Sequence, residues 1–170
     1  MKIGFVGLGN VGSKLAGSLL RNGYEVIVRD LNEEFISDFV SRGAVAADSP
    51  MQLAQLSDLI ITCLPSPSAC SVVMEGTDSE AGIIDGLSAG KIWLEMSTTD
   101  ESERRRLGAL VQAAGADPVD CPVSGGCHRA DTGNISIFAG CSRSVFERAL
   151  PVLTTLGRRV LHTGELGTAS

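Results

Sequence analysis

The sequence predicts an α/β protein with a doubly wound, mainly parallel β-sheet and helices on both faces of that sheet. Short β-rich runs alternate with amphipathic helical patterns from the first residues onward, which is the order expected of parallel strands joined by crossover helices. One run, "DLIITCLP" at residues 58–65, is almost continuously apolar, as is typical of a strand buried on both faces. A sheet of this kind binds ligands beyond the carboxyl ends of its strands, where the strand order reverses.

The first half of the chain divides into strands and helices with clear ends. The strand "KIGFV" is followed by a helical spacing of apolar residues from Asn10 to Arg21, which meets a stop signal at Asn22-Gly23. Ser49-Pro50 and Ser66-Pro67 each pair a capping residue with a first-turn proline, so two further helices are expected to begin there. The other elements predicted in this half are strands at 24–30, 44–47 and 58–65 and helices at 32–43 and 49–55.

The second half continues the alternation. The run "KIWLEM" predicts a strand at 91–96, and a helix follows from Asp100 to Ala114 with Leu107, Leu110 and Val111 on one stripe. No repeat, low-complexity tract or linker interrupts the sequence, so we expect a single domain over residues 1–170. The remaining predicted elements are strands at 117–123, 134–140 and 158–164 and a helix at 142–156.

Composition and charge exclude several classes of function. The chain has 170 residues, of which 44% are hydrophobic and 20% charged, and its net charge of −6 argues against nucleic acid or an anionic membrane as the main partner. The basic run Arg104–Arg106 alternates with acids and is interpreted as a solvated helix face. No apolar stretch is long enough to span a bilayer, and Met1-Lys2 leads directly into a strand, which predicts no signal peptide.

The cysteines predict a reducing compartment, with the cytoplasm as the expected location. There are five of them, an odd number, and none forms a C-x-x-C pair. Their spacing with the nearby histidine fits no usual zinc pattern, so no metal site is predicted. His128 is interpreted as a loop histidine, with a role as proton donor as the alternative, and His162 as structural. The cysteines are Cys63, Cys70, Cys121, Cys127 and Cys141.

A glycine motif, Gly7-x-Gly9-x-x-Gly12, lies between the first strand and the first helix, which is the context that dinucleotide binding requires. Gly7 allows a tight turn, Gly9 lets a pyrophosphate approach the backbone, and Gly12 lets the helix pack closely. The free N–H groups and dipole of the helix start attract phosphates. The predicted cofactor-binding turn comprises Gly7, Leu8, Gly9, Asn10, Val11 and Gly12.

An acid follows at the end of the second strand. Asp30 lies 18 residues after Gly12, about where a carboxylate reaches the ribose of adenosine. A carboxylate there accepts hydrogen bonds from both ribose hydroxyls and repels a 2′-phosphate, so NAD is favoured over NADP. Arg29 could pair with a 2′-phosphate, but the strand alternation points it away from Asp30. The alternative is a glycine turn without a ligand, with Asp30 as a helix cap.

Several motifs resemble those of the β-hydroxyacid dehydrogenases, a family that includes 3-hydroxyisobutyrate dehydrogenase. "GFVGLGNVGSKLAGSLLRNGYEVIVRD", "CLPSPSA", "EMSTTD", "DCPVSGG" and "TGNISIFAG" occur in the family's order and cover essentially the whole chain. The "DCPVSGG" element is the most specific of them. The resemblance implies a Rossmann domain that binds NAD, with NADP as the less favoured cofactor.

The resemblance also implies roles for single residues. The segment Ser124-Gly125-Gly126 matches the part that holds the substrate carboxylate, where a hydroxyl and successive backbone N–H groups can point at one anion. A turn that merely joins two strands is the alternative. Leu64 and Pro65 match a pair that contacts the cofactor, and Thr98 matches a residue near the nicotinamide ribose, although a strand end and a helix cap would explain them equally.

Departures from the family pattern are also visible. Ala69 stands where relatives often have an asparagine that contacts the cofactor. Cys121 replaces a common alanine, and residues 127–129 replace small residues, which would reshape the substrate end of the pocket. These differences leave the glycine motif and the acid after the second strand unchanged.

The family's catalytic lysine is expected beyond Ser170, on a helix of an all-α substrate and dimerisation domain. None of the three lysines, Lys2, Lys14 and Lys91, is placed to handle the proton of a substrate hydroxyl. Residues 1–170 are therefore expected to be the dinucleotide-binding domain, with the C-terminal helical domain absent and no catalytic residue present.

The resemblance implies a parent enzyme, a homo-oligomer, that transfers a hydride between a nicotinamide cofactor and a small β-hydroxy acid such as 3-hydroxyisobutyrate or glycerate. The 170-residue chain itself is expected to bind NAD with little turnover. Two alternatives stay open: a non-catalytic dinucleotide-binding or sensing module, and an imine reductase on the same scaffold.

Overall fold

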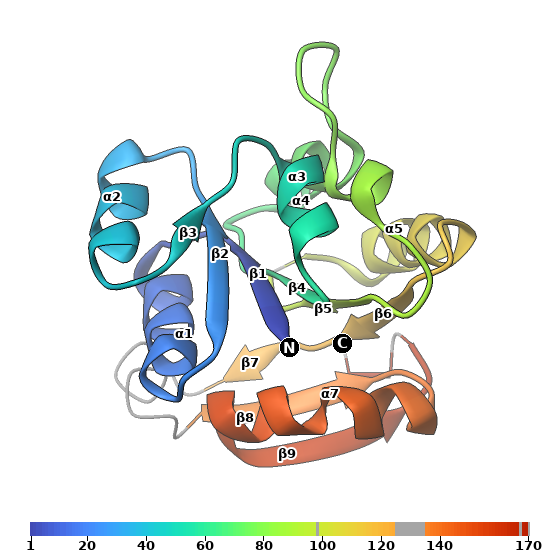
Figure 1. Cartoon of the computed structure of the whole chain (residues 1–170). Helices are drawn as coiled ribbons and strands as arrows, with labels where there is room; N and C mark the ends of the chain where they lie inside the picture. The colour runs from blue at the N-terminus through green and yellow to red at the C-terminus, as the bar shows by residue number, and fades with distance from the viewer. Residues whose placement is uncertain (98, 125–134, 167, 170) are drawn as a thin grey trace.

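The computed structural model describes residues 1–97, 99–124, 135–166, 168 and 169. Their strands form one sheet in the order β3-β2-β1-β4-β5-β6-β8-β7, and β9 pairs with β8 (Figure 1). The bounds of the strands are β1 (Lys2–Val6), β2 (Glu25–Arg29), β3 (Val45–Ala46), β4 (Leu59–Thr62), β5 (Ile92–Glu95), β6 (Asp117–Asp120), β7 (Val123–Ser124), β8 (Ile135–Gly140) and β9 (Gly157–Gly164).

Helices follow the strands as the alternation predicts. Four of them begin at a capping side chain that accepts a hydrogen bond from the first turn: Asn32, Ser49, Ser66 and Asp100. The helices are α1 (Asn10–Arg21), α2 (Glu33–Ser41), α3 (Pro50–Leu56), α4 (Pro67–Glu75), α5 (Glu101–Ala113) and α7 (Arg143–Leu156), with one 3-10 turn, η1 (Ile83–Gly86). No helix of the described residues is long and apolar enough to cross a membrane.

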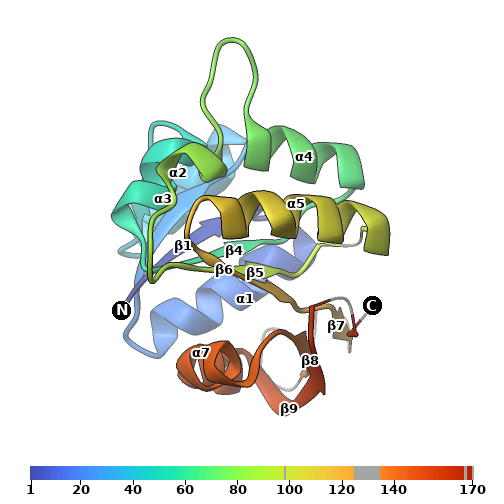
Figure 2. The ribbon, with the colours of Figure 1, turned by 90° about the vertical axis from the view of Figure 1, so that its right-hand side faces the viewer.

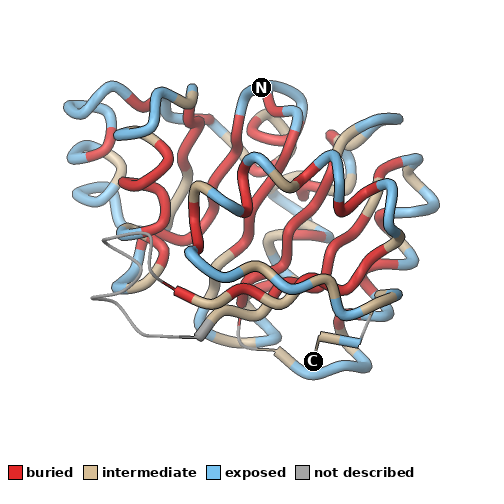
Figure 3. Tube along the Cα trace, turned by 90° about the horizontal axis from the view of Figure 1, so that it is seen from below, coloured by how far each residue is buried: buried red, intermediate tan, exposed pale blue. Residues whose placement is uncertain are grey.

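Two layers of helices cover the sheet. Figure 2 shows α1 and α7 on one side of it and α4 and α5 on the other. Alternate residues of a strand enter separate cores: Val28 belongs to the core that includes residues of α1 and α7, whereas Ile27 belongs to the core that includes residues of α3 and α4. The central strands β1, β2, β4, β5 and β6 are mostly buried (Figure 3), whereas β3 is exposed. The prediction of a doubly wound sheet with helices on both faces is confirmed.

The six strands from β3 to β6 are parallel in the order 3-2-1-4-5-6, the arrangement of a Rossmann fold. The order reverses between β1 and β4, so the carboxyl ends of these two strands flank the expected ligand site. Beyond β6 the sheet becomes mixed, because β8 runs antiparallel to β6 and β7.

One predicted strand is wrong in its extent. Residues 117–123 do not form a continuous strand, since β6 ends at Asp120 and β7 begins at Val123, with Cys121 and Pro122 between them. Proline has no N–H to donate to the sheet, which explains an interruption at this point. Both pieces still pair with the same strand, β8.

Candidate cofactor-binding site

A cleft of about 980 Å³ lies at the carboxyl ends of β1, β2, β4 and β5. It opens where the strand order reverses, which is the position that the fold predicts for a ligand. Eight residues that the sequence predicts to bind the cofactor line this cleft. They are Gly7, Gly9, Asn10, Val11, Gly12, Asp30, Leu64 and Pro65.

The three glycines of the turn are required for different reasons. Gly7 has a φ of 103°, and a Cβ there would collide with the carbonyl oxygen of Cys63. A Cβ on Gly12 would collide with the carbonyl oxygen of Gly7, so this glycine lets α1 pack onto the turn. Gly9 has a negative φ, and among the described residues no atom beyond its chain neighbours lies within 4 Å of the place of its Cβ. The protein itself therefore does not require a glycine at position 9.

The start of α1 is open toward the cleft. Its N-cap is Gly9, which has no side chain to accept a hydrogen bond, and its first turn contains no acid. Ser13 donates the first backbone bond of the helix, to the carbonyl of Gly9. The preceding N–H groups belong to Asn10, Val11 and Gly12, which line the cleft, and they have no acceptor within the helix. This is the arrangement in which a helix binds a phosphate.

Asp30 connects the end of β2 to the glycine turn. One carboxylate oxygen accepts a hydrogen bond from the backbone N–H of Leu8 at 2.6 Å, and the other accepts from the N–H of Asn32 at 2.8 Å. Leu8 itself is buried and contributes this amide rather than cleft surface. A carboxylate oxygen has two lone pairs, so each oxygen can still accept a bond from a ligand. The alternative role of Asp30 as the helix cap is wrong, because Asn32 caps α2.

Arg29 points to the opposite side of the sheet from Asp30, as the alternation predicts. Its guanidinium donates to the carbonyl oxygen of Ala47 at 3.2 Å and forms an ion pair with Glu80 at 2.7 Å. Both Arg29 and Glu80 nevertheless line the same cleft as Asp30.

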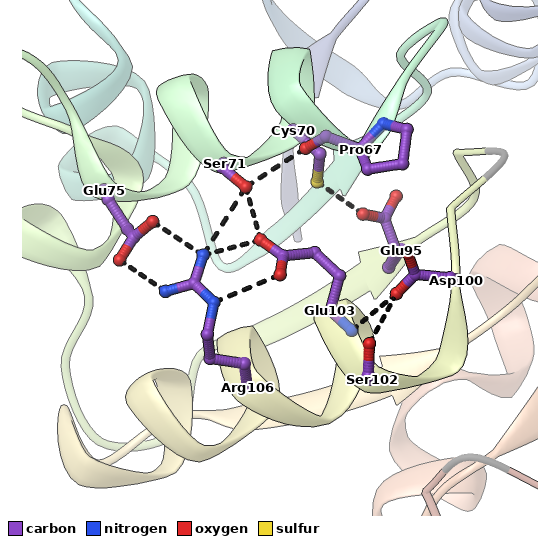
Figure 4. Close-up of polar contacts among 9 residues, drawn as sticks. All are labelled: Pro67, Cys70, Ser71, Glu75, Glu95, Asp100, Ser102, Glu103 and Arg106. Atoms are coloured by element: carbon purple, nitrogen blue, oxygen red, sulfur yellow. Dashed lines mark hydrogen bonds and ion pairs between the residues drawn. The ribbon is translucent and has the colours of Figure 1, made fainter.

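A buried polar network supports the other end of the cleft, beside β4 and β5. Leu64 and Ser97 line the cleft there, and the N–H of Leu64 donates to the Ser97 hydroxyl at 2.8 Å. The N–H of Ser97 donates in turn to the carboxylate of Glu95 at 2.7 Å. Thr62 and Cys70 donate to the same carboxylate, at 2.9 and 2.5 Å. Figure 4 shows the thiol of Cys70 directed from α4 toward Glu95.

This network keeps an ionisable thiol protonated. Burial raises the pKa of Cys70 far above its ordinary value, and the neighbouring charge of Glu95 raises it further. A protonated thiol is a donor, which suits the acceptor oxygens of Glu95. Neutral donors thus surround the one buried carboxylate of Glu95. The hydrogen bonds between them hold the backbone of Leu64 and Ser97 in place at the cleft.

A buried ion pair joins α5 to the end of β6. The guanidinium of Arg104 lies 3.0 Å from the carboxylate of Asp120, and the two side chains are 7% and 0% exposed. Arg104 also donates to the carbonyl oxygen of Thr99 at 2.9 Å and lines the cleft. The interpretation of residues 104–106 as a solvated face is wrong for Arg104, because it belongs to the buried side of α5. Arg105 and Arg106 are exposed as expected.

Comparisons with known proteins agree with this geometry. Residues 2–164 match the family model described as the NAD binding domain of 6-phosphogluconate dehydrogenase. The 2-(hydroxymethyl)glutarate dehydrogenase of Eubacterium barkeri is 36% identical over 98% of this chain and 54% of its own length. The mitochondrial 3-hydroxyisobutyrate dehydrogenase of Mus musculus is 34% identical over 98% of this chain and 49% of its own.

This chain is an NAD-binding domain of the β-hydroxyacid dehydrogenase family. It spans about half the length of the curated relatives that it matches. Among solved structures, Psf3 in complex with NADP+ and 2-OPP superimposes with a TM-score of 0.92 at 28% identity, over 98% of this chain and 58% of that one.

Thr98, Gly125 and Gly126, to which the family resemblance gives a role, lie outside the described residues, and so does His128, interpreted above as a loop histidine. Ser124 is the last residue of β7. Ala69, where dehydrogenase relatives often have asparagine, does line the cleft. The contacts of these residues with a cofactor or a substrate stay predictions.

The other expectations about metal and histidine can be compared with the described part of the chain. No group of three or more potential metal ligands occurs among the described residues. His162 stacks on the ring of Phe146 with centroids 4.7 Å apart, and a ring nitrogen lies 2.7 Å from the carbonyl oxygen of Cys141. These contacts agree with a structural role for His162 in this dehydrogenase-family domain.

Sequence reasoning missed Glu95, Cys70, Arg104 and Asp120 as parts of the site. For Arg104 a signal was present: it precedes Leu107 by three residues and Val111 by seven, so it shares the apolar stripe of α5.

Proposed function

We propose that the chain binds NAD in the cleft and that the whole protein transfers a hydride between the nicotinamide and a small β-hydroxy acid. The observation that carries the first part is the glycine at position 9. Neither backbone strain nor a neighbouring atom of the described residues requires it, whereas a dinucleotide backed against the start of α1 would. The family of the chain supports the same cofactor.

The described residues fit the parts of the cofactor in order along the cleft. The N–H groups at the start of α1 would hold the diphosphate, and the free lone pairs of Asp30 would accept the ribose hydroxyls. A 2′-phosphate would meet the carboxylate of Asp30, so we propose NAD as the preferred cofactor. Leu64 and Pro65 would contact the cofactor at the β4 end.

The nicotinamide supplies the hydride chemistry when NAD is bound. We propose that Thr98 lies beside its ribose and that Ser124, Gly125 and Gly126 hold the carboxylate of the hydroxy acid, as the family resemblance implies. The named activities of the dehydrogenase relatives support a small hydroxy acid as the substrate class. No described residue favours an imine over a carbonyl substrate.

The 170-residue chain is expected to bind NAD with little turnover, because no lysine lies in the described part of the cleft. Lys91 donates to the carbonyl oxygens of Ala54 and Ser57 at the end of α3 and directly precedes β5, which places it at the amino ends of the strands, away from the cleft. A proton donor for the substrate oxygen would come from the family's lysine on a later helix. An assembled homo-oligomer and a cytoplasmic location stay predictions about the whole protein.

Titration with NADH, followed by nicotinamide fluorescence, tests the binding proposal. We expect saturable binding by the wild-type chain and at least a tenfold weaker Kd for Gly9→Ala, since the new Cβ enters the space of the diphosphate. The free energy of unfolding in urea should be unchanged in this variant. Equal affinity for the two chains, or no binding by the wild type, would contradict the proposal.

A second measurement tests the part about catalysis. Oxidation of 3-hydroxyisobutyrate and glycerate by NAD+ is followed at 340 nm, with a full-length family enzyme as the reference. Turnover by the 170-residue chain at the rate of that reference would show that the lysine is not needed.

A further inference from the structure

A charged pair lies on the side of the cleft away from the glycine turn. The Arg29 guanidinium and the Glu80 carboxylate are 2.7 Å apart, and their side chains are 21% and 42% exposed. Arg29 comes directly before Asp30, and all three residues line the cleft. A ligand bound to Asp30 therefore shares the cleft with this pair.

A tight turn after α4 brings Glu80 to Arg29. The N–H of Thr77 donates to the carbonyl oxygen of Glu80 at 2.8 Å, and Gly76 and Ala81 form a bridge across the turn. Gly76 has a φ of 85°, and a Cβ there would lie 2.6 Å from the carbonyl oxygen of Glu80. The turn can adopt this form only with glycine at that position, so the backbone holds Glu80 in place.

Arg29 is the cation at this end of the cleft among the described lining residues. The other arginine that lines the cleft, Arg104, is at the β6 end and is buried against Asp120. An extra phosphate on the adenosine ribose would have to pair with Arg29, and Glu80 already occupies that guanidinium. Two carboxylates thus disfavour a second anion next to Asp30. Asp30 repels it directly, and Glu80 neutralises the guanidinium of Arg29 that would otherwise attract it.

We propose that Glu80 is a specificity-determining residue, which disfavours NADP by neutralising Arg29. This inference rests on the proposed binding of a nicotinamide dinucleotide in the cleft. Removal of the Glu80 charge leaves a guanidinium within the cleft, still fixed by the carbonyl of Ala47, and that guanidinium attracts a 2′-phosphate. Affinity for NAD, which has hydroxyls there, changes little.

The test is calorimetric titration of the chain with NAD+ and with NADP+ in Glu80→Gln and the wild type. We expect the ratio of the NADP+ to the NAD+ association constant to rise about fivefold in Glu80→Gln, as for a charge at partly solvated distance. In Arg29→Gln/Glu80→Gln the ratio should return to the wild-type value. The rise should also shrink in 0.5 M salt, about three times physiological ionic strength.

Glu75→Gln is the matched control, because it removes an equal charge from the end of α4, where Glu75 pairs with Arg106 and does not line the cleft. An unchanged ratio in Glu80→Gln, a rise that persists without Arg29, or an equal rise in Glu75→Gln would overturn the inference while NAD+ still binds. Loss of all binding in the wild-type chain would instead overturn the proposed function, and the inference with it.

Discussion

The two ends of the cleft differ in the chemical groups that form and support them. At the β1–β2 end, glycines leave room and the backbone amides of α1 face the cleft, beside the partly exposed side chains of Arg29 and Asp30. At the β5–β6 end the surface rests on buried ionisable side chains, Glu95 and the pair Arg104–Asp120, each satisfied by protein groups. At Gly9 the first end can lose affinity without losing stability, whereas the buried charged groups of the second end cannot be altered without cost to the fold.

The largest effect is expected at the buried ion pair. Arg104→Ala leaves the carboxylate of Asp120 buried without its cation, and we expect a loss of about 3–5 kcal/mol in the free energy of unfolding. Urea unfolding followed by circular dichroism measures this. Arg105→Ala on the same helix removes an exposed guanidinium and should cost less than about 1 kcal/mol.

A double variant distinguishes the cost of an unpaired buried charge from the cost of lost side-chain volume at Arg104 and Asp120. Arg104→Met/Asp120→Leu removes both charges and should be more stable than Arg104→Ala. If Arg104→Ala were no less stable than Arg105→Ala, the pair would not support the β6 end of the cleft and the contrast between the two ends would be lost.

Next in size is Gly12→Ala, which tests the packing of α1 on the turn. Its Cβ would collide with the carbonyl oxygen of Gly7, and we expect a loss of about 1–3 kcal/mol together with loss of NADH binding. Gly9→Ala is the comparison, since it adds the same methyl group where the described residues leave open space. The melting temperature of both variants measures the difference; a Gly12→Ala chain as stable as Gly9→Ala would contradict this account of the turn.

Glu95→Gln should have a smaller effect, about 1–2 kcal/mol. The amide keeps the shape of the side chain but offers one oxygen to the three donors of Thr62, Cys70 and Ser97, so at least one donor is left unsatisfied. Urea unfolding gives the stability, and the NADH titration shows whether the backbone at Leu64 has moved. Unchanged stability would mean that the carboxylate charge is not needed there.

The sequence predicted the β1–β2 end well because its determinants are local. Gly7, Gly9, Gly12 and the acid after the next strand lie within 24 residues; the glycines act through backbone geometry, and the carboxylate of Asp30 bonds to backbone N–H groups nearby. The course of the parallel sheet followed from the same alternation. The break between β6 and β7 was signalled only by Pro122, which was read as part of a strand.

The β5–β6 end could be predicted less well, because its polar groups depend on partners from other elements. Glu95 is acceptable in a buried strand only with Thr62 on β4 and Cys70 on α4 beside it. Arg104 stands in a run of arginines on α5. Its guanidinium can be buried because Asp120, on strand β6, pairs with it. Spacing on one element can suggest such a residue, but only the tertiary contacts show that its charge is paired.

The smallest effect is expected on the exposed surface between α4 and α5. There Arg106 on α5 forms ion pairs with Glu75 on α4 and with Glu103 on its own helix (Figure 4). Hydrogen bonds from Arg106 and Ser71 lower the pKa of Glu103 to about 2. A lowered pKa stabilises the fold above the ordinary carboxyl pKa, and this contribution is lost as the pH falls toward 2. Because Arg106 is 45% exposed, we expect Arg106→Ala to cost only about 0.5–1 kcal/mol at neutral pH.

The cost of Arg106→Ala should shrink as the pH is lowered from about 5 to about 3, since the two glutamates bind protons in the unfolded chain before they do so in the native wild type, and the native ion pairs thereby lose their advantage. Urea unfolding of both chains across this range measures the change. Arg143→Ala is the control, because its pair with Glu147 spans 3.4 Å between side chains that are about two-thirds exposed. A cost that stays constant with pH would place the contribution of Arg106 in its packing over α4 rather than in its charge.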